Sequence, residues 1–184
     1  LGLLALERGE LDRAVELLGR GIAGIGDEAE HRAPMLLNRS VAHLQAGRLA
    51  AGRADLELAA RDYAATGNEV EKAMAVHNTG YAALLEGDLV RALDTMAEAH
   101  AVLAAASAVN AAICDLDRAQ VLRDAGLVTE AERSLERVAH VFGAHRMRQA
   151  RGETEYHLAR SLLSHEPARA ATVAAAACRR FRAV

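Results

Sequence analysis

One short phrase recurs along the chain, and its best-formed copy reads Gly87-Asp-Leu-Val-Arg-Ala92. Related phrases begin at Gly9, Gly47 and Gly126, and an altered one begins at His165, so successive starts lie 38, 40, 39 and 39 residues apart. A fixed period of this size is typical of repeat arrays in which each repeat is one supersecondary unit. The sequence therefore predicts such an array.

The residues on both sides of the phrase follow the spacing of helices. Apolar and small residues recur at three- and four-residue steps from Ala73 to Leu85, and again from Leu89 to Leu103. Gly87 can adopt the left-handed conformation that ends a helix, and Asp88 can cap the helix that follows. Each repeat is therefore predicted to be two antiparallel helices joined by a tight turn.

The same pattern predicts ten helices in five hairpins. The expected ranges are 1–8, 11–24, 28–46, 49–66, 69–86, 89–106, 109–125, 128–142, 147–163 and 167–182. We expect one domain over 1–184, with repeats at roughly 1–26, 27–67, 68–107, 108–145 and 146–184. Because the chain opens inside a repeat already under way, we expect it to be a fragment of a longer protein.

Three local signals concern the starts of helices. Asp27 and Asn68 each stand three residues before a glutamate, which is the spacing of a capping box. Pro34 predicts that its helix either begins near Ala33 or bends there. Pro167 suits the first position of the last helix.

Composition supports an all-α fold and excludes several kinds of partner. Of the 184 residues 52% are hydrophobic, mostly Ala and Leu, whereas aromatics make up only 3%. The formal net charge of −3 gives no basis for binding nucleic acid, and no long uncharged apolar run predicts a membrane segment. Two cysteines do not suggest a disulfide scaffold, so a cytoplasmic location is expected.

The repeats resemble the tetratricopeptide repeat (TPR), which favours small residues at its eighth, twentieth and twenty-seventh positions and a glycine at the turn. The third repeat supplies Gly80, Gly87, Ala92 and Ala99, and the second supplies Ser40, Gly47, Gly52 and Ala59. The resemblance implies an α-α superhelix that binds proteins. The period of about 39 exceeds the usual value of about 34, so longer helices are expected.

Small residues at the eighth and twentieth positions also have a physical reason. The two helices of a pair cross closely there, and only Gly, Ala or Ser lets the backbones approach. Gly80 and Ala92 are the pair expected to meet in the third repeat.

The style of the repeats is similar to that of two groups of larger proteins. The stretch from Asn78 to Leu89 resembles arrays that precede a caspase-like CHAT protease domain in actinobacterial proteins. This resemblance implies a sensory or regulatory segment whose protease lies in a fused C-terminal domain, outside this chain. The alternative resemblance is to the effector-sensing arms of helix-turn-helix transcription regulators.

Patterns for catalysis, cofactors or metals are missing from the sequence. Neither His-Glu-x-x-His nor Cys-x-x-Cys occurs, and no glycine-rich phosphate loop is found. Glu153 and His157 share a helix face at four-residue spacing, which is usual for surface contacts within a helix. We therefore expect no enzyme activity in this chain, no cofactor and no metal.

A ladder of polar residues marks the expected binding face. Asn38, Asn78, Asp117 and Tyr156 recur at intervals of 40, 39 and 39 on the first helices of the pairs, which line the concave surface in such superhelices. Asn both donates and accepts hydrogen bonds, which suits a groove that holds a protein or peptide. The predicted partner-binding residues are Asn38, His77, Asn78, Tyr81, Asp117, Gln120 and Arg123. The alternative is that Asn38 and Asn78 satisfy neighbouring backbone groups, or each other between repeats.

The last helix is poor in polar residues. The segment Ala168–Val184 lacks the polar face of a capping element. We expect it to pack against sequence beyond this chain, against a partner, or against another copy of itself.

Overall fold

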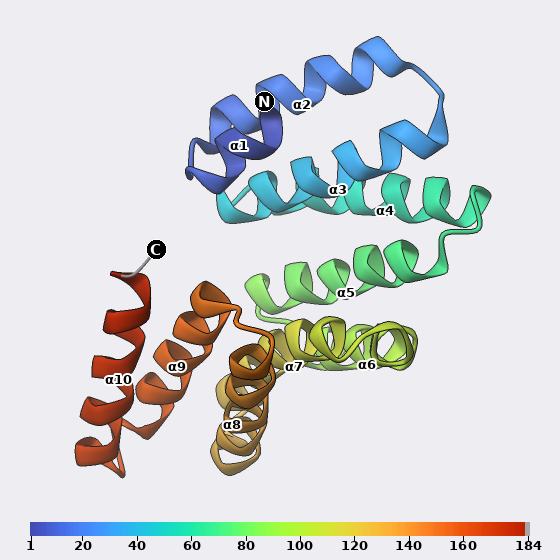
Figure 1. Ribbon diagram of the computed structural model, residues 1–184. Coiled ribbons are helices and arrows are strands. Elements are labelled where there is room, and N and C mark those ends of the chain that lie inside the picture. The colour runs from blue at the N-terminus through green and yellow to red at the C-terminus, as the bar shows by residue number, and fades with distance from the viewer. Residues whose placement is uncertain (183–184) are drawn as a thin grey trace. The chain divides into compact units, whose positions relative to one another are not determined.

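The computed structural model describes residues 1–182, and within that range it contains ten helices and no strand (Figure 1). The last two residues of the segment Ala168–Val184 lie outside the described residues. The helices are α1 (Gly2–Glu7), α2 (Leu11–Ile25), α3 (Ala29–Gln45), α4 (Leu49–Ala65), α5 (Glu69–Leu85), α6 (Leu89–Ala106), α7 (Ala108–Asp124), α8 (Val128–Ala144), α9 (Arg148–Leu162) and α10 (Pro167–Phe181). All ten were predicted, with ends that differ by at most two residues.

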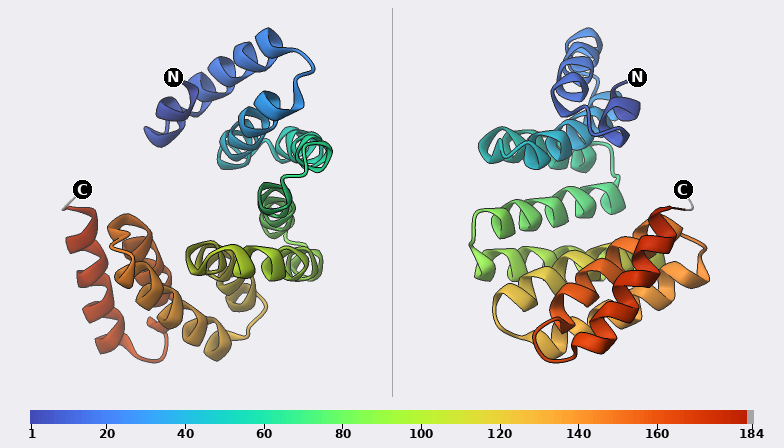
Figure 2. Two further views of the ribbon diagram at one scale, coloured as in Figure 1. Left: turned by 45° about the vertical axis from the view of Figure 1, so that its right-hand side comes forward. Right: turned by 90° about the vertical axis from the view of Figure 1, so that its left-hand side faces the viewer.

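The chain forms two compact units, Leu1–Val102 and Leu103–Val184, whose boundary falls inside α6. In the first unit, consecutive helices from α1 to α5 pack against one another in sequence order. In the second, α7 packs on α8, α8 on α9 and α9 on α10, as the ribbon views show (Figure 2). That residues 1–184 form one domain remains a prediction.

The turns inside the hairpins are made by the glycines of the recurring phrase. Gly9, Gly47, Gly87 and Gly126 have φ values of 72°, 73°, 81° and 81°, which is the left-handed region that glycine enters without steric cost. Arg146, between α8 and α9, adopts φ 57° as the one non-glycine residue of positive φ in the described chain. The predicted role of the turn glycines is confirmed.

Close helix crossings explain the small residues of the second and third repeats. A Cβ atom added to Gly80 would lie 2.8 Å from Met96 Cγ and 3.1 Å from the carbonyl oxygen of Ala92. One added to Gly52 would lie 3.3 Å from the carbonyl oxygen of Ser40. The predicted close approach at these positions is therefore present in both hairpins.

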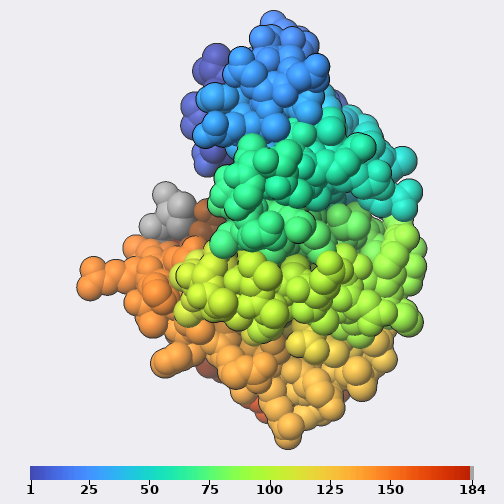
Figure 3. Space-filling model, turned by 90° about the vertical axis from the view of Figure 1, so that its right-hand side faces the viewer, coloured from blue at the N-terminus to red at the C-terminus, as the bar shows by residue number. Residues whose placement is uncertain are grey.

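Each unit buries its own apolar core between neighbouring helices. In the first unit Leu36, Leu56 and Tyr63 pack together. Figure 3 shows the atoms of α4 and α5 next to each other on the face in view. In the second unit Leu135 and Phe142 belong to a buried cluster to which α7, α8, α9 and α10 all contribute. Burial of this apolar surface is the main force that holds the helices together.

Ion pairs link helices within each unit, although no pattern in the sequence indicates them. Arg32 of α3 binds Asp62 of α4 through Nε–Oδ2 and Nη2–Oδ1 contacts of 2.7 and 2.8 Å. In the second unit the buried carboxylate of Glu155 accepts hydrogen bonds from Arg151, at 3.0 Å, and from Arg180 of α10, at 2.6 Å. Such pairs fix the register of one helix against the next.

The predicted helix caps are only partly correct. Asp88 accepts a hydrogen bond from the backbone N–H of Arg91 at 3.1 Å, as expected. Asn68 stands at the N-cap of α5 without a side-chain cap bond, and α3 begins after Glu28, because Asp27 pairs with Arg32 instead. The predicted capping boxes are therefore wrong.

Proline positions resolve the remaining alternatives. Helix α3 starts at Ala29 and continues through Pro34, so it does not begin near Ala33. Pro167 occupies the first turn of α10, as predicted.

Candidate functional site

The predicted binding residues of the first unit lie on α3 and α5. Asn38 is half-buried, and its Nδ2 donates to the carbonyl oxygen of Pro34 at 2.8 Å, one turn earlier in the same helix. This bond is what the alternative interpretation of the ladder expected. Asn38 also lines an open groove of about 410 Å³ together with Leu18 of α2 and Met35 of α3. Its side chain is therefore tied to its own helix and still reaches the groove.

The three residues on α5 differ in their surroundings. Asn78 is half-buried and forms no side-chain hydrogen bond among residues 1–182. Tyr81 packs against the apolar core that contains Leu36. His77 is fully buried, with 0% of its surface exposed.

The expectation that His77 faces the binding surface is therefore not met. His77 stands three residues before Gly80, which packs against α6, so the two share the inner face of α5. Asn78, the next residue along, is turned by about 100° around the helix axis and keeps partial exposure.

On α7 the predicted residues bind one another or their neighbours. Gln120 Nε2 donates to Asp117 Oδ1 at 3.2 Å. Arg123 donates from Nε and Nη2 to Asp124 Oδ1, at 3.0 and 2.8 Å, and only 15% of its side chain is exposed. The second unit thus brings three predicted residues together on one helix.

Two residues of α9 that were not predicted as site residues face this part of α7. His157 is 9% exposed, and its ring meets the ring of Tyr156 edge-on at 5.3 Å between centroids. Its Nδ1 is buried and has no hydrogen-bond partner among residues 1–182. Burial lowers the pKa of His157, and the positive charge of Arg123 lowers it further, so the ring is neutral near pH 7.

Glu153 lies one turn before His157 on the same side of α9. The residue remains solvent-accessible, yet loss of water around its carboxyl group raises its pKa, and the negative charge of Asp117 adds to the effect. Glu153 and His157 form no bond with each other in the described chain, so the predicted contact within the helix is absent. The four-residue spacing places Glu153 and His157 on the same side of α9. Only the packing of α9 on α7 shows which charged residues lie near them.

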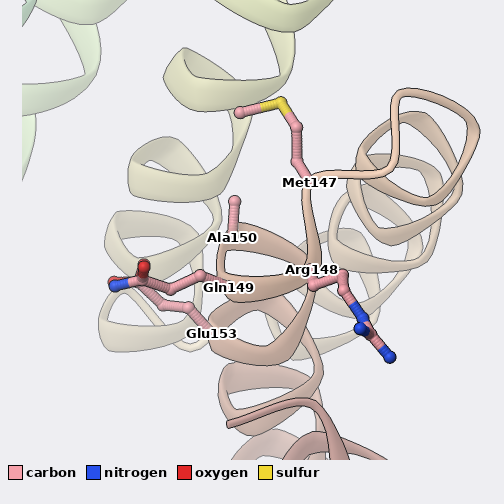
Figure 4. Close-up of a pocket in the computed structure, with 5 residues that line it drawn as sticks. All are labelled: Met147, Arg148, Gln149, Ala150 and Glu153. Carbon is pink, nitrogen blue, oxygen red and sulfur yellow. The ribbon is translucent and has the colours of Figure 1, made fainter. Parts of the chain in front are cut away.

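Glu153 also lines an open groove of about 400 Å³ at the start of α9 (Figure 4). The other lining residues are Met147, Arg148, Gln149 and Ala150. Figure 4 shows the side chains of Gln149 and Glu153 extending to one side of the helix, whereas Arg148 extends to the other. We call this cavity the α9 groove.

A third groove, of about 330 Å³, lies between α9 and α10 and is almost entirely apolar. Tyr156, Leu163, Ala171 and Ala174 line it, and the first two are largely exposed. The last helix, which is poor in polar residues, thus contributes apolar side chains to an open groove.

Residues 1–182 contain no group of three or more His, Cys, Asp or Glu side chains that could hold a metal ion. No helix in the same range is long and apolar enough to cross a membrane. The arrangement offers hydrogen-bonding and charged groups beside open grooves, which suits binding.

Comparison of folds identifies the architecture. A kinesin light chain-like protein from Podosopora anserina with nearly identical TPR-like repeats superposes with a TM-score of 0.65, at 18% identity, over 98% of this chain and 92% of that one. A substituted form of it gives a TM-score of 0.67 at 18% identity, over 98% and 91%. BtubC (BKLC) from P. vanneervenii gives 0.70 at 17% identity, over all of this chain and 78% of that one.

The chain has the fold of TPR-like helical repeat proteins. The predicted all-α class of stacked helical hairpins is thereby confirmed. No protein-family model matches the chain, and no curated protein sequence matches it.

Proposed function

We propose that the chain is a protein-interaction scaffold that holds an extended peptide segment on the exposed faces of its first helices. The observation that carries the proposal is the same in each unit: a polar ladder residue stands on a first helix beside an open groove. In the first unit this residue is Asn38, which lines its groove directly. In the second it is Tyr156 of α9, which lines the groove between α9 and α10 directly.

The state of these polar groups favours binding over catalysis. Asn78 and Glu153 have no hydrogen-bond partner among residues 1–182, so a ligand can supply one without breaking existing bonds. The residues that line these two grooves and the α9 groove include no nucleophile paired with a base. Asn38, Asn78, Tyr81, Asp117, Gln120 and Arg123 remain our proposed contacts, whereas the buried His77 is no longer among them.

Peptide display on the immobilised chain tests this proposal. A library of random dodecapeptides should yield enriched sequences, and their affinities can be measured by fluorescence anisotropy. Asn78→Ala should weaken the enriched peptides of the first unit about threefold to tenfold, as expected for the loss of one hydrogen bond. Asn68→Ala is the matched control, because Asn68 stands at the N-cap of the same helix, exposed and without a side-chain cap bond.

Two outcomes would count against the scaffold function. The library would yield no enriched peptide, or the ladder variants Asn38→Ala and Asn78→Ala would bind every enriched peptide as tightly as the parent.

The resemblance to arrays of CHAT proteases supports a finer proposal, in which the chain is the regulatory segment of a larger, caspase-like protease. The effector-sensing arm of a transcription regulator is the alternative. The reading frame around this segment distinguishes them: a C-terminal caspase-like domain supports the first, a helix-turn-helix domain supports the second, and neither domain would contradict both. A cytoplasmic location and contact of α10 with another copy remain predictions, the latter open to sedimentation velocity.

A further inference from the structure

The groove between α9 and α10, which we call the α9–α10 groove, lies on a face that corresponds to covered faces of earlier hairpins. In the first unit α5 packs on α4, and Leu56 and Tyr63 of α4 belong to an apolar cluster that includes residues of α5. In the second unit α9 packs on α8, and Leu135 and Phe142 of α8 belong to a cluster that includes residues of α9. The first helix of a following hairpin thus covers one apolar face of the second helix before it.

Helix α10 carries the same face, but there it is open. Ala174 follows Leu135 by one period of 39 residues, and it is exposed whereas Leu135 is only 2% exposed. Phe181 follows Phe142 by the same interval, and 47% of its surface is exposed against 0% for Phe142. Ala170, at the small-residue position of the helix crossing, is buried, so α10 still packs on α9 in the usual way (Figure 1). The open face is therefore the one that another segment covers in the earlier hairpins.

The α9–α10 groove has a hollow where earlier hairpins place a large side chain. Leucine stands at the position of Ala174 in both α4 and α8, and alanine fills less of that space. Ala171, Tyr156 and Leu163 line the groove together with Ala174, and its volume of about 330 Å³ leaves room for one leucine, methionine or phenylalanine side chain. Because Leu163 is 66% exposed, such a side chain would remove apolar surface of both groups from water. The lining therefore favours a large apolar side chain as the occupant.

The charges around the groove decide which kind of partner supplies that side chain. Arg160 is the one charged residue of the lining, and it forms no ion pair or hydrogen bond among residues 1–182. Arg179 is exposed and has no carboxylate partner in that range either, and Pro167–Phe181 contains no Asp or Glu. Two copies of the chain that met symmetrically through this face would bring these arginines together, which like charges disfavour. An acidic partner would instead be attracted.

We propose that the α9–α10 groove binds one leucine, methionine or phenylalanine side chain of the bound peptide, the anchor, and that an acidic residue beside the anchor pairs with Arg160. This inference rests on the proposed peptide-binding function and names the chemistry of the segment that the second unit holds. Tyr156, the ladder residue of that unit, lines the groove itself, so the anchor site is continuous with the proposed binding face.

Filling the hollow tests the anchor. Ala174→Leu introduces the residue type of α4 and α8 at an exposed position, so it should take the space of the anchor and leave the fold intact. Peptides enriched from the random library on the parent chain but not on Ala174→Leu should share Leu, Met or Phe next to Asp or Glu. One such peptide should bind Ala174→Leu about tenfold more weakly than the parent, as expected when a large apolar side chain loses its burial site.

Ala175→Leu is the matched control, because it adds the same side chain at the next position of α10, exposed and outside the groove lining. It should bind the peptide like the parent. Circular dichroism and thermal unfolding would verify that both variants remain folded. Replacing the anchor of the peptide by alanine should weaken binding to the parent by a similar factor, and this measurement requires no change in the protein.

Arg160→Gln tests the acidic residue. It should weaken the same peptide about threefold, within the range for an exposed ion pair. Replacing the acidic residue of the peptide by its amide should weaken binding to the parent similarly, with little further loss on Arg160→Gln. Arg133→Gln, which removes the same charge from an exposed position of α8, is the control and should leave the affinity unchanged.

The outcomes separate the two proposals. Enriched peptides without a shared large apolar residue, or equal affinity of a selected peptide for the parent and a folded Ala174→Leu, would overturn this inference and leave the scaffold function standing. Equal affinity for the parent and Arg160→Gln would contradict the acidic residue. A dimer of the parent in sedimentation velocity that Ala174→Leu abolishes would identify a second copy as the occupant and overturn the inference. A library that yields no peptide at all would overturn the scaffold function, and this inference with it.

Discussion

Arg39 of α3 and Asp55 of α4 form a two-pronged ion pair, in which Nε lies 2.7 Å from Oδ2 and Nη2 lies 2.6 Å from Oδ1. Both side chains are largely buried, with 24% and 10% of their surfaces exposed. Parallel hydrogen bonds of this kind fix both the distance and the rotation of one helix relative to the other. Together with Arg32–Asp62, Arg39–Asp55 is one of two such pairs that join α3 and α4.

Asp55→Asn should therefore destabilise the first unit by about 2–3 kcal/mol. The variant leaves the guanidinium of Arg39 largely buried without its counter-charge, and partial exposure keeps the cost below that of a fully buried pair. Chemical denaturation followed by circular dichroism measures the change. The double variant Arg39→Met/Asp55→Leu, which removes both charges, should be clearly less destabilised, and equal losses for the two would contradict this explanation.

Ala92→Leu should overpack the crossing of α5 and α6 and lower the free energy of unfolding by about 1–3 kcal/mol. Ala92 is fully buried, and its carbonyl oxygen lies where a Cβ on Gly80 would approach within 3.1 Å. Ala101→Leu, at an exposed position of the same helix, is the control and should change stability little. A parental unfolding midpoint for Ala92→Leu would show that the crossing tolerates larger residues.

Arg146→Gly should stabilise the second unit by about 1 kcal/mol. Arg146 has a φ of 57°, a conformation that costs a residue with a Cβ about 1–2 kcal/mol. Glycine avoids this steric cost, but it loses more backbone entropy on folding, which offsets part of the gain. Thermal unfolding detects the gain as a higher midpoint. Arg146→Ala removes the same charge but keeps the Cβ, so a similar gain from alanine would assign the effect to charge.

His157 should make the second unit less stable in mild acid. Burial, and then the charge of Arg123, lowers its pKa below the ordinary value of about 6.5, so the unfolded chain takes up a proton before the folded one does. Stability is then fully present above pH 6.5 and is lost as the pH falls from there through the folded-state pKa. Unfolding midpoints between pH 7.5 and 5 measure the slope.

His157→Gln should reduce that slope without abolishing it. The pKa of His43 in the first unit is also lowered, mainly by burial, so it contributes in the same direction. An unchanged slope in the variant would mean that His157 titrates alike in the folded and unfolded chain.

The fold was largely predictable because its determinants are local and repeated. Turn glycines such as Gly47 and Gly87 act through their own backbone conformation, and helical spacing is visible within a single segment. The ion pairs were not predictable, because Arg39 and Asp55 lie 16 residues apart and meet only once the register of α3 against α4 is known. Capping failed for a similar reason: Asp27 has a competing partner in Arg32.

The surroundings of the predicted site residues depend on packing that the sequence shows only in part. The ladder interval placed Asn38 beside a groove, yet it could not separate Asn78 from the buried His77, since adjacent residues differ by only one step around the helix. Glu153 and His157 were noticed as a pair and assigned to the surface. Their relation to Asp117 depends on how α9 packs on α7, which no pattern within one helix contains.

The seating of Gly80 against α6 has an effect on the opposite side of α5. Because a Cβ at position 80 would lie only 3.1 Å from the carbonyl oxygen of Ala92, this close approach restricts the rotation of α5 about its axis and so helps to set the direction of Asn78. A substitution of Gly80 would therefore change the direction of the exposed side chains of α5. The binding specificity of that surface would change although none of its own residues had been replaced.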